Sequence, residues 1–455
     1  MKLLSITLLL FIVHTNLYSQ SKNWSDSILE KGNYFELIGK DENNIIYYQS
    51  NKRDEKYLDI YTHEYGAIND ELIYQNNDGY LINSNYGIDQ VFTKDKSTIV
   101  LSKLLSNKHQ LIHFYDLKTK ELSTPHTIPV DSNTKLNPLF FNIDNNLILT
   151  SDYESEFTFL ASYNLKTQQF RQLFHTEGEI EFVDEINPEE YIIVLNNKGF
   201  SEIWLQNKER VLVRKFDGYI PNYKIECSDS IISFYFASPN IGLQQLNLNF
   251  RTKVLSPIKF INESIIVEKV TYESDSVPIS GYLIHPKNKL SSKTPLVVYI
   301  HGGPQFHQPY YQLKAFDSTF TLTNSVFVPN IRGSVGYGKS FFHMDDGKHT
   351  KVAPEDIKNG IKHVINKYNF IDSTNIVLTG SSYGGFAIYT TLIKYPDLVN
   401  NAVVSNAVYN YQDALKVMPK FWEPIRADKY TEFEYNSPDF SSNYRIDGTH
   451  VTAYV

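Results

Sequence analysis

The sequence has little to cross-link it and little positive charge. Cys227 is the only cysteine among 455 residues, so no intrachain disulfide can form and the hydrophobic cores alone must stabilise the fold. Lysine and arginine number 43 against 51 aspartates and glutamates, which gives a net charge of −8. Because no basic run or patch is visible either, nucleic acid is not expected as a partner.

Long apolar runs are also absent. The longest, Leu3–Val13, follows Lys2 and is too short to span a bilayer. A charged start, a short apolar stretch and a small residue at Ser19 are typical of a secretory signal peptide. We therefore expect residues 1–19 to be removed and the mature protein to be exported, periplasmic or extracellular, without membrane attachment. The alternative is an N-terminal membrane anchor.

What is abundant indicates a large globular protein rich in short strands. The chain contains 33 tyrosines and 28 phenylalanines, and 42% of its residues are hydrophobic against 21% charged. Aromatic residues favour strands, and this balance is that of a folded protein. A chain of 455 residues is too long for one ordinary core, so at least two domains are expected.

The first half shows weak internal repeats. Short apolar runs alternate with polar turns from about residue 40 to residue 260, with almost no helical period. Four segments resemble one another as strand, polar turn and strand: Phe114–Leu122, Ser162–Phe170, Glu202–Val211 and Leu246–Leu255. Repeats of roughly 45 residues with several strands each are typical of a β-propeller. We predict a propeller-like domain over residues 20–262, with about five blades; another all-β domain, such as a sandwich, is the alternative.

The second half, residues 263–455, changes character because strands there alternate with helices, which predicts a parallel α/β sheet. The expected strands are Ser264–Thr271, Ile279–His285, Leu296–Ile300, Ser325–Val328, Ile376–Leu378 and Ala402–Val404. A helix is expected after Pro354, with that proline in its first turn and an apolar face ending near Tyr368.

The most specific motif in this half is Gly380–Gly384, which fits G-x-S-x-G. Such a motif forms a sharp turn between strand and helix that raises a nucleophilic serine above the sheet edge. A buried strand is expected before it, at Asn375–Thr379, and a helix after it, at Phe386–Tyr395. Ser382 is therefore the predicted nucleophile.

A second loop supports this prediction. The apolar run Pro295–Ile300 leads directly into His301–Pro304, a glycine-rich segment. A buried strand that ends in such a loop can supply one backbone N–H to a developing oxyanion, while the N–H of Tyr383 supplies another. Two matching elements in this order predict hydrolase chemistry.

No metal or other cofactor is expected. The three histidines His301, His307 and His343 lie in this region, but they do not show the close spacing of a zinc motif. The other polar candidates favour structural roles. We expect Arg332 and Tyr337 to form an internal ion pair and packing beneath the site. We expect Glu189–Glu190, an acidic pair that could hold a peptide N-terminus, to be a solvated turn. The aromatic segment 410–440 is expected to cover the site.

Three motifs together resemble a known family. His301–Pro304, Asn330–Gly338 and Gly380–Gly385 are similar in order and spacing to those of the prolyl oligopeptidase family of serine peptidases. The branch that they resemble contains acylaminoacyl peptidases and dipeptidyl peptidases. The resemblance implies a β-propeller followed by an α/β-hydrolase domain, so it extends over almost the whole mature chain.

The resemblance also implies an activity. Members of this family cleave short peptides, and the propeller restricts entry to small or unfolded substrates. By position, Ser382 corresponds to the nucleophile, and the N–H groups of Tyr383 and Gly303 correspond to the oxyanion donors. Short peptides are then the expected partners. A carboxylesterase with the same elbow, and an inert propeller that only binds peptides, are the alternatives.

The remaining triad groups depart from the family pattern. The acid and the histidine should follow Ser382 in that order. The segment Thr449–Val455 is expected to form the strand that precedes the acid. We therefore expect the triad Asp and His to lie beyond Val455, the sequence to be truncated, and these 455 residues alone to be inactive.

The candidates upstream of that strand are poor. His450 is the only histidine after Ser382, but it precedes a strand instead of lying in a late loop. Asp439 and Asp447 are expected in surface turns. None of the three is therefore assigned to the triad.

Overall fold

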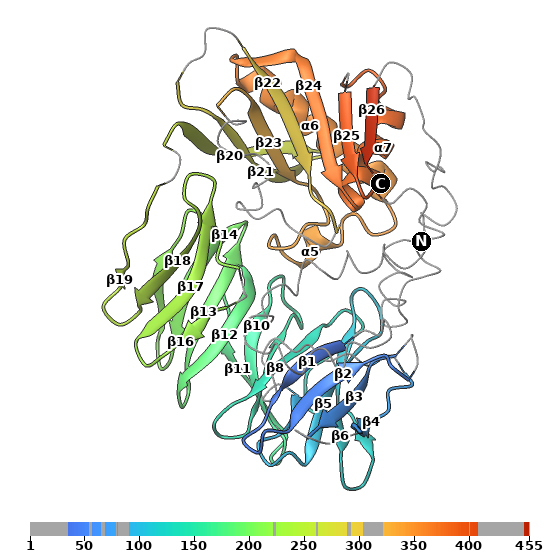
Figure 1. The fold of residues 1–455 in the computed structure, drawn as a ribbon, viewed down its shortest axis with the longest axis vertical. Coiled ribbons are helices and arrows are strands. Elements are labelled where there is room, and N and C mark those ends of the chain that lie inside the picture. Colours follow the sequence, from blue (N-terminus) through green and yellow to red (C-terminus); the bar gives the residue numbers. More distant parts are fainter. Residues whose placement is uncertain are drawn as a thin grey trace.

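The computed structural model describes residues 35–407 and 450–454. Within the first range it leaves out 54–56, 65–68, 79, 81–90, 222–223, 261–262, 289–292, 304–321 and 400. Five small antiparallel sheets form one part, and a seven-stranded sheet with helices forms the other (Figure 1). Within the described ranges, no helix has the length and apolar composition needed to cross a membrane.

The first part is the predicted propeller-like domain. Its first sheet contains β1 (Phe35–Lys40), β2 (Ile46–Ser50), β3 (Asp59–His63) and β4 (Glu71–Tyr74), and its second contains β5 (Thr98–Leu104), β6 (Gln110–Asp116) and β7 (Leu122–Ser123). The third contains β8 (Leu136–Phe141), β9 (Leu147–Ser151), β10 (Phe159–Asn164) and β11 (Gln169–Phe174). The fourth contains β12 (Glu179–Asn187), β13 (Glu190–Asn197), β14 (Phe200–Gln206) and β15 (Arg210–Lys215), and the fifth contains β16 (Glu226–Cys227), β17 (Ile231–Ser238), β18 (Gly242–Asn249) and β19 (Val254–Leu255).

Consecutive sheets share buried apolar clusters. Ile60 and Ile99 lie in the cluster of the first and second sheets, and Ile112 and Leu149 in that of the second and third. The third sheet packs on the fourth, and the fourth on the fifth, in the same way. Each sheet therefore buries its faces mainly against its neighbours in the sequence, as blades do.

The repeats found in the sequence are the last hairpins of four of these sheets. In three of them, the side-chain oxygen of Asp116, Asn164 or Asn249 accepts hydrogen bonds from the backbone N–H groups two and three residues later, at 2.7–3.0 Å. Four residues after each, the backbone has a positive φ of 56–61°. The similarity between the segments thus reflects a shared Asx-type turn.

The second part is built on one mixed sheet, in the order β20-β21-β23-β22-β24-β25-β26. Its strands are β20 (Ile265–Ser274), β21 (Val277–Pro286), β22 (Thr294–Ile300), β23 (Ser325–Asn330), β24 (Ile371–Ser381), β25 (Asn401–Ser405) and β26 (His450–Tyr454). Its helices are α5 (Lys339–Phe342), α6 (His349–Lys367) and α7 (Tyr383–Lys394). From β23 to β26 neighbouring strands run parallel, and the fold is the predicted α/β hydrolase.

Both faces of this sheet are buried at its centre. On one face, α6 and α7 pack on each other and on side chains such as Leu296, Val298 and Phe327. On the other face, Val297 and Val326 belong to a separate apolar cluster. Burial on both faces explains why these strands read as continuous apolar runs instead of alternating patterns.

One predicted boundary is wrong. Helix α6 begins at His349, and Pro354 lies inside it instead of in its first turn. The His349 side chain is fully buried and contacts Asp345 and Tyr383, so tertiary contacts hold a first turn that the local sequence does not specify. These contacts offset the hydrogen bond that the proline cannot donate.

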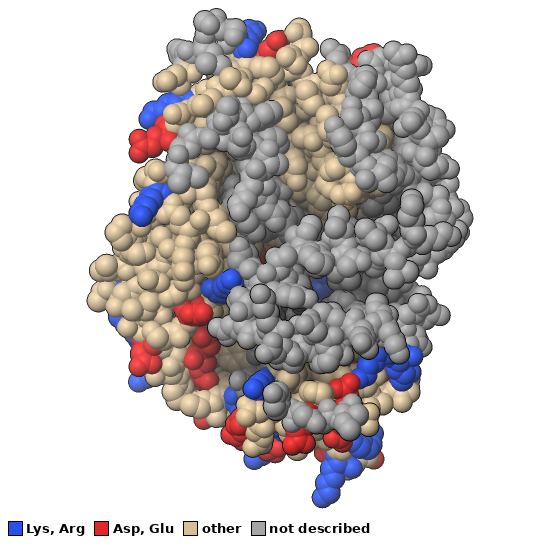
Figure 2. All heavy atoms as spheres, viewed as in Figure 1, with Lys and Arg blue, Asp and Glu red and all other residues tan. Residues whose placement is uncertain are grey.

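The loop from residue 331 to residue 348, here called the docking loop, joins the two parts. In the propeller, Glu156 accepts hydrogen bonds from both the N–H and the hydroxyl of Ser340, each at 2.8 Å. Three further contacts join Lys339 to Asp152 at 3.4 Å, Asn107 to Asp346 at 3.1 Å, and the Lys198 N–H to the Gly336 carbonyl at 3.1 Å. The loop thus rests on the second, third and fourth sheets. On the face in Figure 2, acidic and basic side chains are interspersed over the propeller end.

A buried ion pair fixes the start of the docking loop. The Arg332 side chain donates hydrogen bonds to Asp356 of α6 at 2.6 and 2.9 Å, and to Asp275 in the β20–β21 turn at 2.8 Å. The Asp356 side chain has no exposed surface. Tyr337 is packed against the core and accepts a hydrogen bond from Asn330 at 2.9 Å. The structural roles predicted for Arg332 and Tyr337 are confirmed.

Replacing Arg332 should destabilise the fold strongly. Arg332→Met leaves the buried Asp356 carboxylate without its cation, which should lower the free energy of unfolding by about 3–5 kcal/mol in urea denaturation. The matched control is Arg171→Met, which removes the exposed Arg171–Glu189 pair and should cost about 0–1 kcal/mol. Equal losses in the two variants would contradict the prediction.

Candidate active site

Ser382 lies at the turn between β24 and α7, as the motif predicts. Its backbone has φ 55° and ψ −123°, a conformation that is unusual for a residue with a side chain. The Ser382 N–H donates to the Ser405 carbonyl of β25 at 3.2 Å, and its own carbonyl accepts from the Phe386 N–H at 3.3 Å. The strained residue is therefore held from the strand side and from the helix side.

The glycines of the motif are required by close packing. A Cβ added at Gly380 would lie 2.7 Å from the carbonyl oxygen of Ile300, the last residue of β22. A Cβ at Gly384 would collide with the same oxygen and would lie 2.8 Å from the carbonyl oxygen of His301. The first turn of α7 thus sits directly against the end of β22, at a distance that only glycine allows.

The glycine-rich loop after β22 lies beside the serine. A Cβ added at Gly302 would lie 3.4 Å from the Cβ of Ser382. Gly303 is exposed with φ 89°, and Tyr383 is the first residue of α7, where a backbone N–H has no partner within the helix. The helix dipole also favours negative charge at this end. The structure thus brings Ser382, Tyr383 and Gly303 together, and the nucleophile role of Ser382 and the oxyanion roles of Tyr383 and Gly303 remain predictions.

A buried polar cluster that the sequence did not reveal lies under this turn. The Nδ1 atom of His349 is 3.0 Å from the Tyr383 hydroxyl and 2.9 Å from a carboxylate oxygen of Asp345. Nearby, the Nε2 atom of His301 is 2.9 Å from the Ser334 hydroxyl, and burial lowers the pKa of His301. Asp345 and His349 are only four residues apart, but His349 and Tyr383 are 34 residues apart, and His301 and Ser334 are 33 apart, so no motif spacing reveals the cluster.

Other predicted residues lie apart from the site or outside the described residues. Those outside the described residues are His307, Asp439, Asp447, the segment 410–440 and residues 1–19. The strand expected at Thr449–Val455 is confirmed as β26, but His450 opens it. In the sheet register Ser381 pairs with Ser405, and Ser405 with Tyr454, so His450 lies at the opposite strand end from the elbow.

The expectation of a solvated turn at Glu189–Glu190 is confirmed only for Glu189, because Glu190 is buried and opens β13. The pair joins β12 to β13 at the opposite end of β13 from Lys198, which contacts the docking loop. Glu190 accepts a hydrogen bond from Arg251 of the neighbouring sheet at 2.6 Å, and this partner lowers the pKa of Glu190 to about 2. The pair therefore does not face the hydrolase domain.

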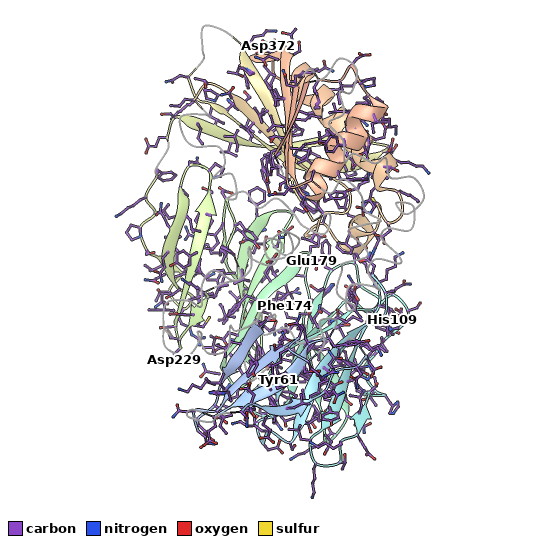
Figure 3. All side chains as sticks on the ribbon, turned by 45° about the vertical axis from the view of Figure 1, so that its right-hand side comes forward. Tyr61, His109, Phe174, Glu179, Asp229 and Asp372 are labelled. Atoms are coloured by element: carbon purple, nitrogen blue, oxygen red, sulfur yellow. The ribbon has the colours of Figure 1, made fainter. Side chains whose placement is uncertain are left out.

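A different acidic pair does lie at the hydrolase end of the propeller. Figure 3 shows Glu179 at the end of β12 that points toward the hydrolase domain, and Glu181 follows on the same strand. Thr158 donates to Glu179 at 3.1 Å, and Tyr219 donates to Glu181 at 3.0 Å. Burial raises the pKa of Glu179 to about 7 and also raises the pKa of Glu181. Sequence reasoning missed this pair because its spacing follows no motif.

Metal ligands do not gather around the serine. His301 contacts Ser334, and His343 contacts Asp346 at 2.8 Å. In the described ranges, no three His, Cys, Asp or Glu side chains are grouped so that they could hold a metal ion.

Comparisons with known proteins place this site in context. Residues 318–451 match the model of the prolyl oligopeptidase family. Dipeptidyl-peptidase 5 of Aspergillus oryzae is 31% identical over 225 residues, which cover 46% of this chain and 29% of that protein. Human dipeptidyl peptidase 8 is 23% identical over 261 residues, 54% of this chain and 28% of that protein. The chain thus spans less than a third of the curated relatives that it matches.

Solved structures show the same fold over more of the chain. A prolyl endopeptidase superimposes with a TM-score of 0.77 at 13% identity, covering 92% of this chain and 65% of that one. A puromycin-hydrolyzing peptidase of Mycobacterium tuberculosis gives a TM-score of 0.71 at 12% identity, covering 89% and 66%. The arrangement of propeller and hydrolase sheet is therefore shared with these peptidases.

The strain at Ser382 should be measurable as stability. Ser382→Gly removes the side chain from an unfavourable backbone conformation and should raise the free energy of unfolding by about 1 kcal/mol. Ser381→Gly, one residue earlier in β24, has no strain to relieve and should lower it by about 0.5–1 kcal/mol. Urea unfolding of both variants decides the point, and a loss of stability in Ser382→Gly would refute it.

Glu179 should make stability depend on pH. In the folded protein its pKa is about 7 against an ordinary 4.5, so the folded state retains a proton that the unfolded state releases. The free energy of unfolding should therefore fall as pH rises from 4.5 to about 7, by about 3 kcal/mol. Glu179→Gln should abolish this pH dependence, whereas the exposed Glu177→Gln should show the same pH dependence as the wild type. An equal dependence of the free energy of unfolding on pH in all three proteins would contradict the prediction.

Proposed function

We propose that the protein is a serine peptidase that cleaves short peptides through Ser382, because residues 318–451 match the model of the prolyl oligopeptidase family. The observation that carries the proposal is the elbow itself. A serine with φ 55° stands between a strand and a helix N-terminus, with Gly302 packed against its Cβ. Nucleophile and oxyanion loop are thus side by side before any substrate binds.

The chemistry follows from that placement. The Ser382 hydroxyl attacks the peptide carbonyl, and its proton passes to a general base. The negative charge that develops on the carbonyl oxygen is stabilised by the N–H groups of Tyr383 and Gly303. Collapse releases the amine, which takes the proton, and leaves an acyl-enzyme on Ser382 that water then hydrolyses.

The base and its acid partner come from outside the described residues in this proposal. Within the part of the chain that the structure describes, the Ser382 hydroxyl makes no hydrogen bond to a histidine or a carboxylate. The elbow therefore supplies the nucleophile and the oxyanion donors, and the activating pair has to be brought to it.

The preferred substrate is a peptide with a free N-terminus. Two curated relatives are named dipeptidyl peptidases. In this chain, Glu179 and Glu181 lie two residues apart on β12, with Glu179 at the hydrolase end of the propeller, and a peptide ammonium group held there would favour their ionised forms over the protonated forms that burial favours. Such a contact favours release of short N-terminal fragments over cleavage inside long chains. We also propose that the mature protein is exported, on the leader-like pattern of residues 1–19.

Hydrolysis of peptide amides tests the proposal. A preparation that contains the catalytic acid and base should release the chromophore from dipeptidyl amides, and Ser382→Ala should lower kcat by at least about 1,000-fold. The neighbouring Ser381→Ala should retain activity, because its side chain belongs to the strand. Turnover of simple esters without turnover of amides would replace the peptidase with a carboxylesterase.

Labelling separates the nucleophile from the complete triad. Residues 1–455 alone should react slowly with a fluorophosphonate, because a serine without its base is a poor nucleophile. Dipeptidyl-peptidase 5 serves as the fast reference. Labelling of Ser382 as rapid as in that reference would show that the base lies within these 455 residues.

A further inference from the structure

The polar cluster under the elbow consists of groups that are costly to bury. Asp345 and His349 have no exposed side-chain surface, and Tyr383 is 2% exposed. An apolar side chain would fill the same space without a desolvation cost, so a buried carboxylate, imidazole and phenol require mutual contacts. The His349 Nδ1 atom provides them, at 2.9 Å from Asp345 and 3.0 Å from the Tyr383 hydroxyl.

One edge of the His349 ring meets both of the other groups. Its Nδ1 atom shares a hydrogen bond with the Tyr383 hydroxyl, and the Asp345 carboxylate lies 2.9 Å from the same nitrogen as an ion-pair contact. The imidazole is thereby oriented, and the tyrosine hydroxyl meets the same edge of the ring. The ring faces of His349 and Tyr383 also pack edge to face, with centroids 5.4 Å apart. The Tyr383 side chain is consequently anchored at its far end as well as at its backbone.

The docking loop reaches both candidate oxyanion donors. Asp345 lies at one end of that loop, and a Cβ added at Gly333 would collide with its carboxylate. At the other end, Ser334 binds His301, which immediately precedes Gly302 and Gly303. The docking loop therefore supports both candidate donors. It reaches Tyr383 through Asp345 and His349. It reaches the segment of Gly303 through Ser334 and His301.

We propose that Asp345, His349 and the Tyr383 hydroxyl form a positioning network that holds the Tyr383 N–H where the oxyanion develops. The inference rests on the proposed function, because it assigns a role in that reaction. These residues do not touch the substrate. They act by fixing the residue after the nucleophile, and a displaced donor loses much of its effect on the transition state while ground-state binding is retained.

Steady-state kinetics of three variants provide the first test. Tyr383→Phe and His349→Gln should each lower kcat about tenfold and leave KM within about twofold. His349→Asn carries an amide where Nδ1 stands and should recover most of the loss. The control is Tyr272→Phe, which removes another buried phenol hydrogen bond, to the Asp356 carbonyl at 2.8 Å, and should retain kcat.

Hydrogen exchange provides the second test and does not require turnover. Backbone amides in a peptide covering residues 381–388 should exchange faster in Tyr383→Phe and His349→Gln, but not in His349→Asn or Tyr272→Phe. If a wild-type preparation that contains the catalytic acid and base cleaves no peptide, the proposed function fails, and exchange alone still decides whether the network holds the elbow. Unchanged exchange, or a loss of kcat that His349→Asn does not restore, would overturn the network.

Discussion

The close approach of helix α7 to the end of β22 is the constraint on which the hydrolase site depends. The first turn of the helix meets the Ile300 carbonyl so tightly that no side chain fits at Gly384. With the helix held there, the chain can leave β24 only through a residue with positive φ, and that residue is Ser382. The same approach brings Gly302 to the serine. The positions of Ser382, the helix N-terminus and the glycine-rich loop are therefore consequences of one packing contact.

The docking loop connects this packing to the rest of the molecule. Its first residues are tied to α6 by the Arg332–Asp356 ion pair, and its middle rests on Glu156 in the propeller. Side chains from the same loop meet His301 and His349 beneath the elbow. The loop thus contacts three parts of the molecule: the propeller, the sheet and the turn at Ser382. Its glycines and buried polar groups are explained by these tertiary contacts and not by a local preference for a turn or a helix.

The sequence was informative where local rules determine the structure. The Asx turn begun by Asp116 repeats with the same residue types, so the blades were visible as repeats. The elbow at Ser382 follows a strict turn motif. The start of α6 at His349 was missed because buried contacts, not helix propensity, create its first turn. The contacts of His349 with Tyr383 and of Glu179 with Thr158 were missed for a related reason: the partners are 34 and 21 residues apart in the sequence, and no spacing rule connects them.

The order of the sheets has a consequence for biosynthesis. Each blade packs mainly on the blade before it, so the propeller can form step by step as the chain leaves the ribosome. The hydrolase sheet is different, because β22 is inserted between β23 and β24, which are both made later. The docking loop is synthesised after the five sheets that the structure describes, and it contacts three of them. We therefore expect the hydrolase domain to complete its folding against a propeller surface that is made first.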